Sequence, residues 1–371
     1  MQIKLQELHG WVAEQLGVHI EDLRFTSISG DASPRVYFRV TPLSIDSGGC
    51  SPSCGVRSEN HLPTIGAASA IAAYAPASEN NDAFIKVQTI MATAGVAVPA
   101  LYRNETEKGF FLMEDLGDVL LADNLTNASA DAIYERALKI LHRFVGGAIT
   151  SVPLPVFDDE RIHNELAVFP EWFLTKLLGL SPASLPRKLL AKLAELLLQS
   201  FQEQPRCLVH RDFHSRNLMC TGPESLAAID FQDAVIGPVT YDPVSLLKDC
   251  YVQWHRKDQL RWLEQHRLRL IALGVPVIDQ NNFIRSYDLV GLQRHLRVLG
   301  VFARLHLRDG KHSYLADLPL VVFYVLEVLE LYSRNPVFAA FDDWMRSEVM
   351  PLLVQAPWWS EHVPSSPIVR P

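Results

Sequence analysis

The first part of the chain alternates short runs of helical and strand periodicity. Residues 3–16 place apolar side chains at helical spacing, whereas residues 25–29 and 36–40 are β-branched and aromatic. An alanine-rich apolar run follows at residues 67–74. These patterns predict a small lobe built on a sheet.

A further helix and a hairpin complete this lobe. Residues 82–91 carry apolar side chains on one face at helical spacing, and Gly95 ends the predicted helix. Two apolar runs at 99–103 and 109–114 are separated by a short polar stretch. This arrangement predicts a hairpin whose second strand leads into the next part of the chain.

Residues 41–66 show neither periodicity. The stretch is rich in Ser, Gly and Pro, which predicts a flexible insertion. Cys50 and Cys54 within it suggest zinc, but no second ligand pair follows at a usable spacing. The pattern therefore disfavours a metal site in the insertion.

From residue 128 onward the pattern changes to long helical segments. They are predicted at about 130–149, 165–180, 187–203, 242–274, 280–306, 315–334 and 337–355. We therefore expect an α+β fold with two lobes, a β-rich one over residues 1–115 and a mainly helical one over 116–371. A cleft between two such lobes is a common place for a small-molecule site.

Composition narrows the class of protein. Hydrophobic residues make up 48% and charged residues 20%, as in soluble globular proteins, and the net charge of -8 disfavours nucleic acid and anionic membranes as partners. Five cysteines, and an N-terminus without a signal-peptide pattern, favour the cytoplasm. The apolar run at 318–326 is too short to span a bilayer. We expect a cytoplasmic monomer with small-molecule partners.

One segment carries the candidate chemistry. His210, Arg211, Asp212 and Asn217 match the pattern H-R-D-x₄-N, and Asp230 follows an apolar strand-like run. In phosphoryl transfer a carboxylate orients and deprotonates the accepting hydroxyl, and oxygen ligands hold Mg²⁺ on the ATP phosphates. Ordinary turn and cap residues are the alternative, but the joint match favours Asp212 as the catalytic residue and Asn217 and Asp230 as metal ligands.

These motifs resemble those of the aminoglycoside phosphotransferase family of kinase-like enzymes. Within it, the chain is most similar to bacterial anomeric kinases of N-acetylmuramate and N-acetylglucosamine. The closer resemblance is carried by residues 30–39, 111–117, 210–217, 230–234 and 237–251. It implies a kinase-like fold, ATP and Mg²⁺ as cofactors, and phosphorylation of the sugar C1 hydroxyl in cell-wall sugar recycling.

The resemblance also implies where the nucleotide binds. A glycine turn would cover the phosphates, although the same residues suit an ordinary hairpin turn. Residues 114–116 would form the hinge that binds adenine through main-chain groups. The candidate nucleotide-binding residues are Gly30, Asp31, Ala32, Ser33, Arg35, Glu114 and Leu116.

The chain departs from the kinase pattern in two places. Residues 68–74 lack the usual third-strand lysine, so Arg35 and Lys86 are candidates for the missing positive charge, with simple solvation as the alternative. His214 stands where protein kinases commonly have lysine. Arg216 would face the phosphoryl group or the sugar, or form a salt bridge.

Two further acids complete the set of candidates. Asp233 joins His214 and Arg216 as a candidate contact for substrate or phosphate. Asp242 begins a predicted helix, and we expect it to be the N-cap, with a substrate role as the alternative.

Two rival functions stay open at this point. One is a kinase of aminoglycoside antibiotics, which the acidic net charge permits, although an arginine beside the acceptor would repel a polyamine. The other is a catalytically silent nucleotide-binding protein, suggested by the missing lysine. The presence of Asp212, Asn217 and Asp230 disfavours it.

Overall fold

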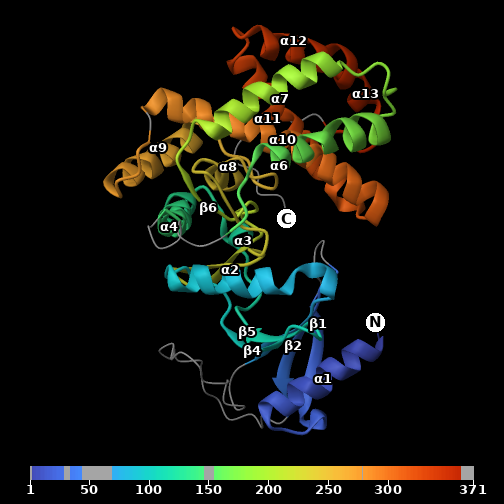
Figure 1. Ribbon diagram of the computed structural model, residues 1–371, viewed down its shortest axis with the longest axis vertical. Coiled ribbons are helices and arrows are strands. Elements are labelled where there is room, and N and C mark those ends of the chain that lie inside the picture. Colours follow the sequence, from blue (N-terminus) through green and yellow to red (C-terminus); the bar gives the residue numbers. More distant parts are fainter. Residues whose placement is uncertain (1, 29–33, 44–68, 146–153, 278, 361–371) are drawn as a thin grey trace. The chain divides into compact units, whose positions relative to one another are not determined.

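The computed structural model describes residues 2–28, 34–43, 69–145, 154–277 and 279–360. The chain divides into two compact units (Figure 1). The first unit is Met1–Asp118 with Met219–Pro223 and Ala227–Asp233; the second is Val119–Leu218, Glu224–Leu226 and Ala234–Pro371. One unit is built on a sheet and the other is mainly helical, which confirms the predicted α+β fold.

A five-stranded antiparallel sheet forms the centre of the first unit, in the strand order β1-β2-β3-β5-β4. Two helices accompany it, α1 (Gln2–Leu16) and α2 (Asn81–Thr93), with single 3₁₀ turns at Ile20–Asp22 and Ala77–Glu79. The strands are β1 (Leu23–Ile28), β2 (Val36–Pro42), β3 (Ala70–Tyr74), β4 (Leu101–Glu105) and β5 (Phe110–Glu114).

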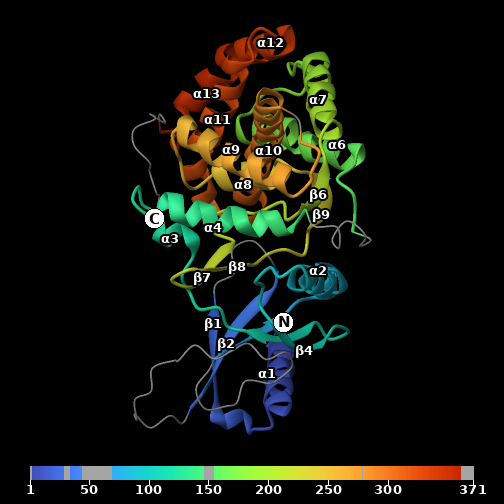
Figure 2. The ribbon, with the colours of Figure 1, turned by 90° about the vertical axis from the view of Figure 1, so that its left-hand side faces the viewer.

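The alternation of side chains along the strands gives this sheet two apolar faces. Ala72 pairs with Leu112 in the β3–β5 register, and both belong to the core formed with α1. The next pair, Ala73 and Phe111, points to the opposite face, where Phe84 of α2 packs on it. Figure 2 shows α1 and α2 on either side of the strands.

The predicted hairpin at 99–114 is confirmed as β4 and β5. Its turn requires glycine at position 109, where φ is +75° and an added Cβ would lie 2.0 Å from the carbonyl oxygen of Ala75. Residues 44–66 of the predicted insertion, which include Cys50 and Cys54, lie outside the described residues.

The second unit consists mainly of helices. They are α3 (Leu121–Asn124), α4 (Ala130–Arg143), α6 (Asp159–Val168), a π-helical stretch η3 (Phe169–Leu177), α7 (Arg187–Gln202), α8 (Tyr241–Leu247), α9 (Arg256–Ala272), α10 (Gln280–Asp309), a 3₁₀ stretch (His312–Asp317), α11 (Leu318–Leu331), α12 (Pro336–Trp344), a π-helical stretch (Met345–Val349) and α13 (Met350–Gln355). Strands β6 (Arg206–Val209) and β9 (Val235–Pro238) pair antiparallel. A second pair of strands, β7 (Leu218–Gly222) and β8 (Ser225–Ala228), belongs largely to the first unit.

Helix α10 is the central element of this unit. It contacts α6, η3, α7, α8, α9 and α11, and buried residues occur on all its sides. Its Gly300 lies against the main chain at Val168, where α6 passes into η3. In the part of the chain that the structure describes, no helix is long and apolar enough to cross a membrane.

The single helix predicted at 242–274 is wrong. The structure has two helices there, α8 and α9, separated by residues 248–255. Helical side-chain spacing continues through the break, but the polar groups in it bind elsewhere: the buried Lys248 Nζ lies 2.8 Å from Glu327 Oε2. Because long-range contacts of this kind interrupt the helix, the local periodicity predicted a helix that was too long.

Candidate active site

The 210–217 loop leaves β6 and is fixed at its start by a buried carboxylate. Asp242 accepts the backbone N–H groups of His210 at 2.7 Å and Arg211 at 3.0 Å. Arg211 has a φ of +78°, a strained left-handed conformation, and its carbonyl accepts a hydrogen bond from Ser245 Oγ at 3.1 Å. Our N-cap prediction for Asp242 is wrong, because Thr240 occupies that position and Asp242 binds the loop instead.

A second buried carboxylate fixes the far part of the loop. Asp249 accepts the N–H of Ser215 at 2.8 Å and that of Tyr251 at 2.9 Å. Asp242, in the first turn of α8, and Asp249, just after its end, therefore fix the two ends of the loop. No local pattern marks either residue for this role, because each carboxylate binds a backbone group more than 30 positions away in the chain.

The carboxylate of Asp212 lies between these anchors and is 30% exposed. Arg297 of α10 approaches it, with Nη1 3.7 Å from Oδ1. Burial alone would raise the pKa of Asp212, but the positive charges of Arg297 and Arg211 outweigh burial and hold that pKa well below its usual range. Asp212 is therefore an anion at neutral pH.

Asn217 closes the loop on itself. Its Nδ2 donates to the carbonyl of Asp212 at 2.9 Å and lies 3.4 Å from Nε2 of His214. The guanidinium of Arg216 stacks on Tyr251, 3.8 Å from the ring centroid. Among the described residues Arg216 has no ion pair, so the salt bridge considered for it is not formed.

A cluster of charges beside the loop links it to two helices. Glu165 of α6 accepts a hydrogen bond from Arg211 Nη2 at 2.5 Å and one from Gln293 Nε2 at 3.1 Å. Its Oε1 is also 3.6 Å from Nε of Arg297. Glu165 and Arg297 thus orient the groups around Asp212, and neither was among the sequence candidates because no motif marks them.

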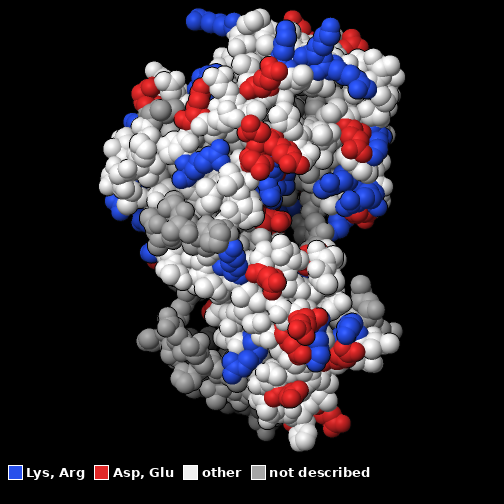
Figure 3. Space-filling view, viewed as in Figure 1, with Lys and Arg blue, Asp and Glu red and all other residues white. Residues whose placement is uncertain are grey.

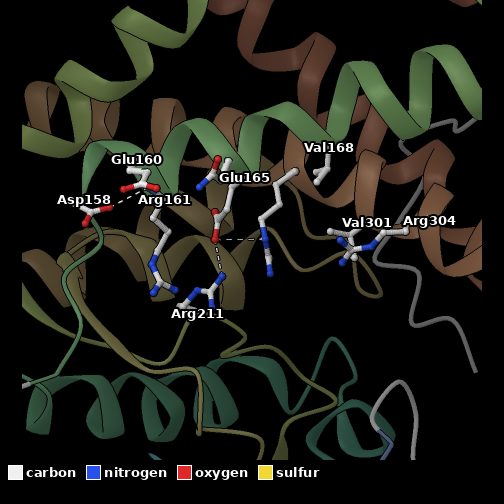
Figure 4. A pocket seen from close by; sticks show the side chains of 10 residues that line it. Asp158, Glu160, Arg161, Glu165, Val168, Arg211, Val301 and Arg304 are labelled. Atoms are coloured by element: carbon white, nitrogen blue, oxygen red, sulfur yellow. Dashed lines mark hydrogen bonds and ion pairs between the residues drawn. The ribbon is translucent and has the colours of Figure 1, made fainter. Parts of the chain in front are cut away.

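Next to this cluster lies a cavity of about 450 Å³ (Figure 4). Faces of α6 and α10 form its walls, together with Arg211. Charges of both signs gather on this face of the second unit (Figure 3). The charged lining residues are Asp158, Glu160, Glu165, Arg161, Arg211, Arg297 and Arg304.

Asp230 belongs to the first unit, two residues after the end of β8. It is exposed, has a left-handed φ of +63°, and its Oδ1 accepts a hydrogen bond from Gln232 Nε2 at 2.9 Å. The next residue, Phe231, is buried and stacks on Phe84 of α2, with ring centroids 5.1 Å apart. The apolar ring therefore anchors the turn that presents the carboxylate.

Arg35 is buried in the same unit, so simple solvation does not describe it. Its Nη2 donates to the carbonyl of Glu79 at 3.0 Å, and its guanidinium lies over Phe84. Burial raises the pKa of Tyr37, which Arg35 lowers and Asp230 raises through their charges. Arg35 and Asp230 therefore act on one common neighbour. Lys86, the other basic candidate, is exposed on α2.

The predicted hinge, residues 114–116, lies at the end of β5, and two of its side chains are hydrogen-bonded within the protein. The side chain of Glu114 accepts the N–H of Ala100 at 3.1 Å, and Asp115 is bonded to Arg39 at 2.6 Å. Within the described ranges, the N–H and C=O of Leu116 have no hydrogen-bond partner.

The remaining candidates are either exposed or outside the described residues. Asp233 is exposed in the first unit. The predicted phosphate-covering turn, Gly30, Asp31, Ala32 and Ser33, lies outside the part of the chain that the structure describes.

Comparison with known proteins agrees with this chemistry. The model of the phosphotransferase enzyme family matches residues 24–273. A protein of Pseudomonas putida named N-acetylmuramate/N-acetylglucosamine kinase is 35% identical over 91% of this chain and 94% of its own length. A Pseudomonas aeruginosa protein of the same name is 37% identical over 73% of this chain and 79% of its own. Among solved structures, ethanolamine kinase of Plasmodium vivax matches with a TM-score of 0.55 at 16% identity, covering 86% and 85% of the two chains.

Proposed function

We propose that this chain, which belongs to the phosphotransferase enzyme family, transfers the γ-phosphoryl group of ATP to the C1 hydroxyl of N-acetylmuramate and N-acetylglucosamine. The products would be sugar 1-phosphates, in cell-wall sugar recycling. The observation that carries the proposal is the anionic Asp212, held in a loop that two buried carboxylates fix, beside a cavity. The identity of the sugar is taken from the names of the two Pseudomonas relatives.

Asp212 would orient the attacking hydroxyl. Phosphoryl transfer has a loose transition state, so most of the catalysis comes from positioning and charge stabilisation. A carboxylate with a depressed pKa stays ionised and can accept a hydrogen bond from the C1 hydroxyl; because it is a weak base, it takes the proton late, when the oxygen bonds to phosphorus. The loop contacts of Asn217 and Arg211 keep this carboxylate in place.

Asn217 and Asp230 would hold Mg²⁺. One amide and one carboxylate provide the oxygen donors that this ion prefers, and the carboxylate of Asp230 is exposed. When bound, the ion would supply positive charge to the phosphate oxygens. Glu114 and Leu116 would bind adenine at the hinge, and Gly30, Asp31, Ala32 and Ser33 would cover the phosphates.

Arg35 would replace the missing strand lysine. It is buried with its guanidinium over Phe84, and the same ring stacks on Phe231, the residue next to Asp230, which supports a phosphate-binding cation near a metal ligand. His214, Arg216 and Asp233 stay candidates for phosphate or sugar contacts.

The cavity disfavours an aminoglycoside as the acceptor. Four arginines and three acids line it, so its lining carries a surplus of one positive charge. A polycationic antibiotic would be repelled there, whereas a neutral or acidic sugar would not.

The test is to incubate the protein with ATP, Mg²⁺ and a panel of amino sugars, aminoglycosides and choline. Phosphorus NMR then locates the new phosphate. We expect it on the anomeric oxygen of both N-acetylated sugars. Phosphorylation of an aminoglycoside hydroxyl alone would overturn the proposal.

A further inference from the structure

Two helix faces meet at the cavity beside Asp212. On α6, residues 161, 164, 165 and 168 follow the i, i+3, i+4, i+7 spacing of one face. On α10, residues 297, 301 and 304 do the same. The cavity is therefore built on two packed helices rather than on loops, which gives its side chains fixed positions.

The arginines in this cavity fall into two groups. Arg211 and Arg297 share Glu165, so their charges are balanced by a common carboxylate. Arg161 and Arg304 have no ion pair with any described residue. The acidic Asp158 nearby is engaged as the N-cap of α6, where it accepts the backbone N–H of residue 161 at 2.9 Å.

Arg304 shows most clearly that a partner is missing. Its Nε is buried and has no hydrogen-bond partner among the described residues. Buried donors in proteins are nearly always bonded, so an orphaned one indicates a group that binds there. Figure 4 shows Arg161 on α6 and Arg304 on α10, both bordering the same cavity. Figure 4 shows the two guanidinium groups at opposite ends of the cavity, so an anion that enters beside Arg304 would satisfy the guanidinium of Arg304.

The cavity adjoins the reacting position. Arg297 lies 3.7 Å from Asp212 and also lines the cavity, so a sugar with its C1 hydroxyl at Asp212 would extend its other substituents into this space. N-acetylmuramate differs from N-acetylglucosamine by a lactyl ether at C3, which ends in a carboxylate. Guanidinium groups match the planar geometry of a carboxylate through paired hydrogen bonds.

We propose that Arg304 forms a carboxylate-binding subsite for the lactyl group of N-acetylmuramate. This inference rests on the proposed function and deepens it, because it assigns the discrimination between the two sugars to a named residue. N-acetylglucosamine leaves the subsite without its anion.

The first experiment substitutes Arg304→Gln and, for comparison, Arg161→Gln at the other end of the cavity. The measured quantity is the ratio of kcat/KM for N-acetylmuramate to that for N-acetylglucosamine. We expect Arg304→Gln to lower this ratio roughly 10–100-fold, as the loss of a charged hydrogen bond does, and Arg161→Gln to lower it less. Arg308→Gln is the matched control, since Arg308 is an exposed arginine of α10 bonded to Asp309 and should leave the ratio unchanged.

The second experiment changes the substrate instead of the protein. The wild-type protein is given N-acetylmuramate and its lactyl amide, which has the same shape and no charge. We expect the amide to lose the same factor as Arg304→Gln does, and the variant to lose little more when given the amide. The first half of this comparison uses only the wild-type protein, so it does not depend on whether a variant folds.

Specific outcomes would overturn the inference. One is an unchanged sugar ratio in Arg304→Gln with an increased KM for ATP, which would assign the cavity to nucleotide phosphates. Another is equal turnover of the acid and its amide by the wild-type protein. If the wild-type protein phosphorylates neither sugar, the proposed function fails and the subsite falls with it, whereas activity on both sugars without discrimination refutes the subsite alone.

Discussion

Two aspartates near the 210–217 loop have opposite surroundings and therefore different tasks. Arginine charges keep the pKa of Asp212 low despite burial, whereas burial raises the pKa of Asp242 to about 7, against the two backbone N–H groups that it accepts. The first carboxylate is an anion 3.7 Å from Arg297, and the second accepts two backbone N–H groups. A difference of environment, and not of residue type, thus separates the reacting group from the positioning group.

Substituting the two proposed chemical carboxylates should separate their roles. Asp212→Asn removes the group that orients and accepts the proton, so turnover should fall roughly 10²–10⁴-fold while ATP affinity stays close to that of the wild type. Asp230→Asn should weaken the binding of Mg²⁺-ATP and turnover together, because a negative charge at the metal is lost. Steady-state kinetics and a nucleotide-binding titration measure both. Near wild-type turnover in both variants would refute the assignments.

Asp242→Asn tests the positioning role. An amide can offer only one oxygen, so one of the N–H groups of His210 and Arg211 faces an NH₂ group instead. We expect a loss of about 1–3 kcal/mol in the free energy of unfolding, as for an unsatisfied buried group, and a lower kcat with little change in KM for ATP. Urea unfolding and kinetics check this. Asp343→Asn, at an exposed aspartate, is the control and should change neither.

At this scale the sequence identified residues that belong to a local motif. Asp212, Asn217 and Asp230 stand in short patterns, and the structure places Asn217 on the carbonyl of Asp212. The roles of Glu165 and Arg297 were missed because they lie 47 and 85 positions from Asp212 and have no pattern of their own. Their contribution depends on packing between helices, which no local spacing encodes.

Among the elements, α10 determines how closely the cavity walls approach. A Cβ at Gly300 would lie 2.4 Å from the main chain of Val168, which cannot move aside as a side chain can. Glycine at this position therefore sets the separation of α10 from the end of α6.

Gly300→Ala should destabilise the protein and open the cavity. We expect a loss of roughly 1–3 kcal/mol or more in the free energy of unfolding, as for overpacking against rigid neighbours. Gly291→Ala on the same helix is the control, since its Cβ would meet Val244 Cγ1 at an ordinary 3.5 Å and helix propensity favours alanine by up to about 1 kcal/mol. Thermal unfolding of both variants gives the comparison. Equal stability of the two variants would contradict this account of Gly300.

The elements themselves were largely predictable, since apolar periodicity follows directly from which face is buried. The predicted strands and the hairpin at 99–114 agree with β1 to β5, and the predicted helix at 280–306 agrees with α10. The prediction for 242–274 failed where Lys248 and Asp249 bind groups far along the chain. The helix breaks there because these polar residues form tertiary contacts, and apolar periodicity carries no information about such contacts.

At the scale of the whole molecule, the candidate residues come from both compact units. Asp212 and Asn217 belong to the second unit, and Asp230 belongs to the first. The chain reaches Asp230 only after crossing the second unit, so the first unit is not continuous in sequence. The lobes predicted from the sequence, 1–115 and 116–371, were each one continuous segment, and this division stays a prediction.

Histidines in the second unit should make the stability of the whole protein depend on pH. His142 of α4 stacks on His266 of α9, with ring centroids 5.0 Å apart. Burial lowers the pKa of His142 to about 4 and that of His266 to about 3, and neither ring nitrogen of His266 has a hydrogen-bond partner among the described residues. Both rings stay neutral in the folded protein at pH values where the unfolded chain binds protons.

The sign of the effect follows from these pKa values. Below the unfolded value of 6.5, protons bind the unfolded chain preferentially, so the free energy of unfolding should fall as pH decreases toward about 4. Each fully buried histidine contributes at most about 1.4 kcal/mol per pH unit. Asp242 acts oppositely, because its raised pKa lets the folded state take up a proton between pH 7 and 4. The wild-type curve alone is therefore a sum of opposing effects.

Comparison with His266→Phe isolates the histidine contribution, because Asp242 is common to both proteins. Phenylalanine preserves the ring stacking and cannot be protonated, so the variant should lose less stability than the wild type between pH 7 and pH 5. Urea unfolding at pH 7, 6 and 5 measures the difference. His19→Gln, which alters an exposed imidazole of the first unit, should follow the wild-type curve. If His266→Phe followed the wild-type curve as well, the buried pair would not be the origin of the acid sensitivity.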